Sequence, residues 1–217
     1  MHINDGLLPI TVLAGGYAVT TALTWYSLRK INKLPDPQAA VPKVALLTSA
    51  FFVASWVHIP VPPTSVHLVL NGLMGVVLGW YAMPAIVVGL LLQAVMFQHG
   101  GLTTLGVNAA MIGIPALLGY GIFQLKNYVL KGYKYQPHIL AFTGGALGVG
   151  ITALIAFTIL ITTIPAYVDV TAERTAITAL TVAHVPLALI EGVFTAMIVT
   201  FLLRVRPDMV DGYAATA

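Results

Sequence analysis

The sequence of 217 residues contains no cysteine, which excludes disulfides and thiolate metal ligands. It also carries little charge. Asp, Glu, Lys and Arg make up 8% of the residues, whereas a soluble domain has about a quarter. Apolar residues make up 59%, and apolar runs long enough to cross a bilayer recur along the chain. The composition predicts an all-α integral membrane protein with a single transmembrane domain, residues 1–217.

Several motifs are also missing. The chain has no G-x-x-x-x-G-K-[ST] motif and therefore no P-loop for ATP, and it has no H-E-x-x-H motif of an intramembrane zinc protease. No segment alternates at period two, which argues against a β-barrel. The N-terminus lacks a basic region and an A-x-A cleavage site, so we expect no removable signal peptide and expect His2 to remain in the mature protein.

The apolar runs predict about seven transmembrane helices. Their approximate ranges are 7–28, 44–59, 66–82, 84–98, 104–125, 138–163 and 177–203. The second and third are short for a full crossing. The segment HIPVPPTSV at 58–66 holds three prolines, which predict a structured turn or a re-entrant segment there.

The basic residues predict the orientation. If the N-terminus is outside, nine of the ten lie in inner loops and only Arg174 lies outside. The nine are Arg29, Lys30, Lys33, Lys43, Lys126, Lys131, Lys134, Arg204 and Arg206. We therefore predict a multi-pass protein of the cell (cytoplasmic) membrane with an outer N-terminus and a cytoplasmic C-terminus, which requires an odd number of spans.

This orientation sorts the six histidines. Only His138 falls on the inner side, and the other five fall in the outer half: His2, His58, His67, His99 and His184. A metal ion bound by these side chains would be captured from outside.

The second residue has unusual ligand chemistry. The free amine of Met1, the amide nitrogen between Met1 and His2, and the His2 imidazole Nδ1 can close two fused chelate rings. Three nitrogens then lie in one plane, and one position stays open. Amide nitrogen must lose its proton to bind a metal, which Cu(II) and Ni(II) promote, and tetragonal nitrogen sites favour the same two metals. His67 follows a proline-containing turn on the outer side, where its Nε2 can complete the plane.

Three segments resemble one known family. MHINDG at 1–6 resembles the M-H-I-x-D/E-G opening of CbiM/NikM proteins, and TSVHLVLNG at 64–72 resembles their T/S-x-H-L-x-x-x-G segment. The run QAVMFQHGGLTTLGVN at 93–108 is similar to their Q-A-L-L-F-x-D/H-G-G-L-T-x-L-G-x-N signature. These proteins are the substrate-binding S components of nickel and cobalt energy-coupling-factor (ECF) transporters.

The resemblance implies a seven-span S component, a transport subunit and not an enzyme, whose N-terminal segment (1–6) folds into the bundle. It implies Ni(II) or Co(II) as the transported substrate, with no permanent cofactor. The implied ligands are the Met1 amine, the His2 amide nitrogen and imidazole, and His67. The implied partners are a transmembrane coupling (T) subunit, two cytoplasmic ATPase subunits and a small auxiliary N-type membrane subunit. We expect the last of these to be a separate polypeptide.

Nickel is the favoured substrate. Cobalt-type members often carry S-C-S-H-P around the matching histidine, whereas this chain has TSVHL at 64–68. An all-nitrogen square plane also suits d8 Ni(II) better than Co(II). The alternatives are a Co(II) S component of the same family and, from another class, an intramembrane redox or hydrolytic enzyme that uses the outer histidines.

Other polar residues are candidates for the surroundings of the site. Ligating imidazoles usually donate their second N–H to an oxygen, and Thr64, Ser65 and Asn108 are candidates near His67. His99 is a further candidate beside the site, although it can equally be a wetted interfacial residue. Roles for His58, His184 and the intramembrane Glu191 are open. Asp5, in a DG pair, is interpreted as a loop or helix-cap residue.

Overall fold

The computed structural model describes residues 2–61, 64–129, 133–165 and 168–210, without the side chains of 58–61 and 64–65. Seven α-helices occur in this part of the chain: α1 (Ile10–Ile31), α2 (Val41–Ala54), α3 (Asn71–Leu78), α4 (Ala82–Phe97), α5 (Leu105–Gln124), α6 (Gln136–Thr162) and α7 (Val170–Val205). Short 3₁₀ turns follow α3, α5 and α7 at Gly79–Tyr81, Leu125–Asn127 and Pro207–Met209.

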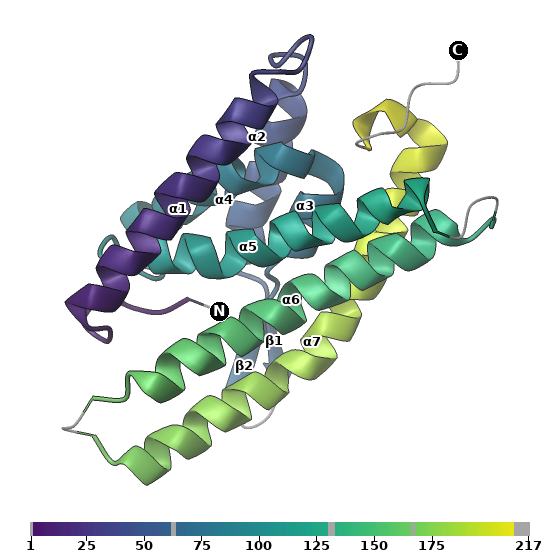
Figure 1. Cartoon of the computed structure of the whole chain (residues 1–217). Coiled ribbons are helices and arrows are strands. Elements are labelled where there is room, and N and C mark those ends of the chain that lie inside the picture. Colours follow the sequence, from purple (N-terminus) through teal and green to yellow (C-terminus); the bar gives the residue numbers. More distant parts are fainter. Residues whose placement is uncertain (1, 62–63, 130–132, 166–167, 211–217) are drawn as a thin grey trace.

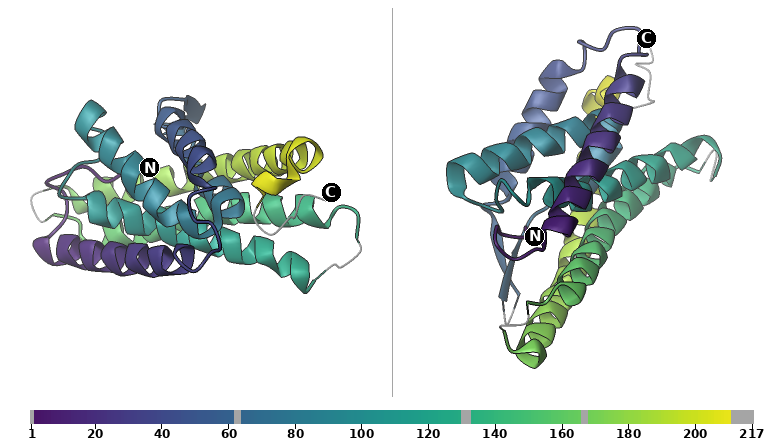
Figure 2. Two further views of the ribbon diagram at one scale, coloured as in Figure 1. Left: turned by 90° about the horizontal axis from the view of Figure 1, so that it is seen from above. Right: turned by 60° about the vertical axis from the view of Figure 1, so that its left-hand side comes forward.

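The helices form two groups. α6 and α7 run side by side as a long antiparallel pair, and α1–α5 pack along one side of that pair (Figure 1). Figure 2 shows the same division from above and from the side. The short α3 lies in the centre, where all eight of its residues are buried. The centre of the bundle is therefore the place where the chain that follows His67 is held.

Within the described residues, four helical segments are long and apolar enough to cross a membrane: Asn71–Phe97, Leu105–Asn127, Gln136–Thr162 and Val170–Val205. The prediction of one span over 66–82 is wrong. That range begins in a strand, and α3 is only 8 residues long, about 12 Å at the α-helical rise. The break predicted near 83 lies instead at Gly79, whose φ of 59° ends α3. The count of seven spans stays a prediction.

The proline-rich segment after α2 is a β-hairpin. α2 ends at Ala54, so the predicted second span over 44–59 ends too late. Strand β1 (His58–Val61) pairs antiparallel with β2 (Thr64–His67), and His58 lies opposite His67 in the register. The two strands flank residues 62–63, which lie outside the described residues, so the structured turn or re-entrant segment itself stays a prediction. The hairpin delivers His67 to the bundle at the end of β2.

One end of the molecule gathers several of the basic residues. The Lys43 ammonium, at the start of α2, donates to the carbonyls of Val77 and Met209 at 3.3 and 3.0 Å. It thereby joins α2 to the segment that follows α7. The α1–α2 connection and the end of α7 lie at this end, away from the hairpin (Figure 1). That it faces the cytoplasm stays a prediction.

Two close contacts set the frame of the site. A Cβ on Gly72 of α3 would lie 2.5 Å from the Gly144 carbonyl oxygen, so only glycine allows α3 to approach α6 so closely. On the other side, the Thr20 hydroxyl of α1 donates to the Gly106 carbonyl of α5 at 2.6 Å. α5 therefore packs against α1, the helix that follows the N-terminal segment.

Candidate metal centre

The segment that precedes α1 is anchored inside the bundle by Asn108. Its Oδ1 accepts a hydrogen bond from the Ile3 backbone N–H at 2.9 Å, and its Nδ2 donates to the Ile3 carbonyl at 3.0 Å. Ile3 is 3% exposed and Asn108 is 2% exposed. Asn108 thus fixes the peptide next to His2, and its predicted place beside His67 stays a prediction.

Asp5 ties the same segment to the start of α5. Its Oδ1 accepts hydrogen bonds from the Thr103 hydroxyl at 2.6 Å, the Thr104 N–H at 3.0 Å and the Thr104 hydroxyl at 3.1 Å. These bonds, the one from Thr103 foremost, lower the pKa of the Asp5 carboxyl. A Cβ on Gly101 would lie 2.0 Å from Asp5 Oδ1, so a side chain there would displace the Asp5 carboxylate. Asp5 thus bonds to the turn that precedes α5, whose N-cap residue is Thr104, and its interpretation as a loop or helix-cap residue stays a prediction.

His2 and His67 meet although 65 residues separate them in the chain. His2 Nδ1 lies 3.3 Å from His67 Nε2, and His67 Nδ1 lies 2.9 Å from the Leu68 carbonyl oxygen. Because a carbonyl only accepts, Nδ1 of His67 carries the proton and Nε2 offers a lone pair. Two nitrogens at right angles around one metal, each at about 2.0 Å, lie about 2.8 Å apart. The observed separation is close to that arrangement.

His99 joins this pair from the turn between α4 and α5. One ring nitrogen from each of His2, His67 and His99 lies within 4.8 Å of the other two. The ring centroid of His99 is 4.2 Å from that of His2 and 5.2 Å from that of His67. Among the residues that the structure describes, these three histidines are the one such group of potential ligands, and it contains nitrogen donors alone.

Burial keeps the cluster ready for a cation. The pKa of His2 lies well below its usual value, chiefly because the ring is buried and also because the chain's amino group, His67 and His99 surround it. The Gln93 side chain acts in the opposite direction. The His2 imidazole is therefore neutral at pH 7, and a neutral imidazole is the form that binds metal.

Glu191 of α7 supports His67 from the other side of the bundle. Its carboxylate accepts the backbone N–H groups of Val69 and of Leu70, the latter at 2.7 Å, and the residue is 1% exposed. Leu70 has a φ of 54°, and these two bonds hold it in that left-handed conformation. The sequence marked Glu191 only as an intramembrane charge, because its partners lie more than 120 residues away.

The other residues predicted for the site or its surroundings have side chains that lie outside the described part of the chain or away from the histidine cluster. Met1 lies outside the described residues, and the side chains of Thr64, Ser65 and His58 are not described. His184 contacts its own helix, with Nδ1 2.7 Å from the Leu180 carbonyl oxygen, and is not part of the histidine cluster. The ligand roles of Met1, His2 and His67 therefore stay predictions.

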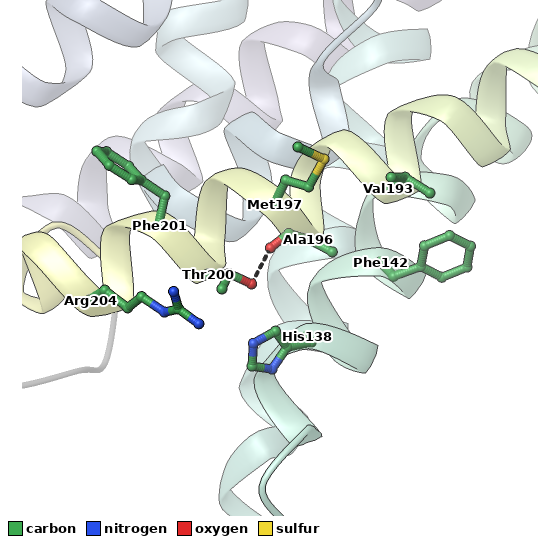
Figure 3. A pocket seen from close by; sticks show the side chains of 8 residues that line it. All are labelled: His138, Phe142, Val193, Ala196, Met197, Thr200, Phe201 and Arg204. Carbon is green, nitrogen blue, oxygen red and sulfur yellow. Dashed lines mark hydrogen bonds between the residues drawn. The ribbon is translucent and has the colours of Figure 1, made fainter.

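A separate groove lies between α6 and α7 (Figure 3). It has a volume of about 490 Å³ and is lined mainly by apolar side chains such as Phe142, Met197 and Phe201, with His138 and Arg204 at one side. The cationic guanidinium of Arg204 repels a metal cation. This groove is therefore not a second metal site.

Known proteins resemble the chain over nearly its whole length. The family profile CbiM, described as "Cobalt uptake substrate-specific transmembrane region", matches residues 2–209. The cobalt transport protein CbiM of Sorangium cellulosum is 32% identical over 97% of this chain and 95% of its own length. The fused nickel transport protein NikMN of Rhodobacter capsulatus is 32% identical over 72% of this chain and 46% of its own length. The crystal structure of a truncated transition metal transporter superimposes with a TM-score of 0.78 and 26% identity, covering 94% of this chain and 99% of the other.

Proposed function

Since the chain belongs to the CbiM family of metal-uptake transmembrane proteins, we propose that it captures Ni(II) from the outer side of the cell membrane for an ATP-driven ECF-type uptake transporter. It is a multi-pass helical membrane protein of a nickel and cobalt transport family. In this proposal it is the substrate-specific S component, and ATP is hydrolysed by its partner subunits.

One observation carries the choice of site: His2 Nδ1 and His67 Nε2 face each other at 3.3 Å, and His67 has its second nitrogen committed to a carbonyl. In the proposed site both nitrogens bind one metal ion. The Met1 amine and the deprotonated His2 amide nitrogen supply the other two ligands of the plane. Asn108 and Asp5 hold the segment in place, so little ordering remains to be done when the ion arrives.

The ligand set supports Ni(II). A deprotonated amide and three further nitrogens form a tetragonal field, which suits Ni(II) and Cu(II). Relatives are named for cobalt as well as for nickel, so Co(II) is the second candidate substrate of the same site. Competition of Co(II) against radioactive Ni(II) on the purified protein measures the preference directly. We expect Ni(II) to bind more tightly.

The proposal is tested by one residue added in front of Met1, with everything after it unchanged. The amine then moves out of the chelate and His2 becomes the third residue. A third-position histidine closes its own plane with the amine and two amides, without His67. We expect His67→Ala to weaken Ni(II) binding severely in the natural chain but to have no effect in the extended one. His138→Ala, outside the cluster, is the matched control.

Uptake gives the second readout. Cells that express the extended protein with its partner subunits should fail to accumulate nickel, because the metal sits in an altered site. Normal uptake by the extended protein would overturn the role of the Met1 amine. The partner proposal is tested in proteoliposomes. Nickel entry should require the coupling subunit and both ATPases, and entry with the S component alone would contradict it.

A further inference from the structure

A third histidine stands beside the proposed plane, and we propose that His99 is an axial ligand that lets this site accept Co(II) as well as Ni(II). This inference rests on the proposed function, because it takes the four-nitrogen plane of Met1, His2 and His67 as given. It assigns His99 a direct bond to Co(II) when that ion occupies the site, and makes His99 a specificity-determining residue.

The ring orientations point to an axial position. The rings of His2 and His67 are inclined to each other by only 24°, whereas the ring of His99 stands at 67° to the first and 71° to the second. The two ligands of the plane thus share an orientation, and His99 is turned nearly at right angles to both.

The spacing also fits three imidazoles on one ion. Ring centroids that sit about 3.2 Å from a shared metal and at right angles to each other are about 4.5 Å apart. The three observed separations are 5.1, 4.2 and 5.2 Å. All three pairs therefore match neighbouring positions around a single ion, which places His99 above the plane and not opposite either partner.

The backbone holds His99 in that place. Gln98 ends α4 in the left-handed region with a φ of 52°, and the His99 N–H donates to the Gln93 carbonyl at 3.2 Å. Gly100 follows with a φ of 83°, and a Cβ there would be 3.1 Å from Asn108 Nδ2. The turn that presents His99 thus packs on the same asparagine that anchors Ile3.

The electron counts of the two metals make an axial nitrogen selective. In a strong four-nitrogen plane, low-spin d8 Ni(II) has a filled orbital along the axis and gains little from a fifth donor. Low-spin d7 Co(II) has one electron in that orbital and binds an axial nitrogen. His99 therefore stabilises bound Co(II) more than bound Ni(II). It reduces the preference for Ni(II) over Co(II) that the four-nitrogen plane alone imposes.

The test compares the natural chain with His99→Leu and His99→Ala under anaerobic conditions. Loss of a group that only supports a metal ligand lowers metal affinity by at least about tenfold. Because His99 is proposed as a direct ligand of Co(II), we expect the Leu variant to lose at least that much Co(II) affinity. Its Ni(II) affinity should stay within about twofold. Electron paramagnetic resonance of the Co(II)-loaded natural chain should show triplet splitting from one axial ¹⁴N nucleus. The splitting should vanish in both variants and return in His99→Ala when free imidazole is added.

The outcomes separate this inference from the proposed function. A natural chain that binds Ni(II) through His67 but shows no axial nitrogen splitting overturns the role of His99 and leaves the proposed function intact. Equal loss of both metals in His99→Leu, without rescue by imidazole, also overturns it, because it indicates a purely structural role. A chain that binds neither metal overturns both proposals.

Discussion

Replacement of Asn108 by alanine tests whether the docked N-terminal segment makes the site. Asn108 supplies the acceptor for the Ile3 N–H and the donor for the Ile3 carbonyl, and Ile3 is 3% exposed. Each buried backbone group left without a partner costs about 1–3 kcal/mol, so the docked segment loses about 2–6 kcal/mol. Because 1.4 kcal/mol corresponds to a factor of ten, we expect Ni(II) affinity to fall by about 30-fold or more.

The assay is calorimetric titration of the detergent-solubilised protein with Ni(II) in the presence of a competing chelator. Asn127→Ala is the matched control, because Asn127 lies in the 3₁₀ turn that follows α5 and its amide donates to Gln124 Oε1. Asn108 bonds to the Ile3 backbone, so we expect the effect to pass through the backbone of residue 3. An Asn108→Ala protein that binds Ni(II) as tightly as the natural chain would refute this reasoning.

Three other experiments test the support of the site by Glu191, its pH dependence and the orientation of the chain. Glu191→Leu leaves the N–H groups of Val69 and Leu70 without their acceptor, at about 1–3 kcal/mol each. We expect a lower Tm and weaker Ni(II) binding, whereas Glu173→Leu, at the half-buried Glu173 in the first turn of α7, should change neither. The pKa of His2 is lowered in the folded chain, so the metal-free N-terminal segment should bind the bundle most strongly above the unfolded pKa of about 6.5 and less strongly as pH falls below it. Hydrogen exchange of residues 3–8 should then become faster at low pH. Exchange rates that show no such change with pH would contradict this. Because the chain has no cysteine, Asp36→Cys and Thr171→Cys report orientation; a membrane-impermeant thiol reagent on whole cells should label the second and spare the first, and the reverse would invert the predicted topology.

The long apolar runs predicted the helices well. Three short motifs predicted the family, and the match of the family profile confirmed it. The failure lay between residues 54 and 82. The run VHLVL at 66–70 has too few residues for its periodicity to tell a buried strand from a helix. The three prolines of the preceding segment, 58–66, indicated a turn, but β1 and β2 form only through pairing with each other.

In the candidate site, too, some residues could be predicted from the sequence and others could not. His2 and His67 were predicted as ligands from chelate chemistry and from the resemblance, and His99 only as a candidate beside the site; the structure brings one ring nitrogen of each together. The groups that hold them were not found in those roles. Asn108 reaches Ile3 across 105 residues, and Glu191 reaches Leu70 across 121. Such pairings depend on how the helices pack, and a single sequence carries no local pattern for them.

The central claim is that the amino-terminal chelate and His67 together bind one Ni(II) ion. X-ray absorption at the nickel edge of the loaded, purified protein tests it most directly. We predict short nitrogen ligands, scattering from two imidazole rings in the plane, and the strong pre-edge feature of a planar nickel ion. In His67→Ala the scattering should fall to that of one ring. A six-coordinate nickel ion with oxygen ligands, unchanged by His67→Ala, would contradict the account.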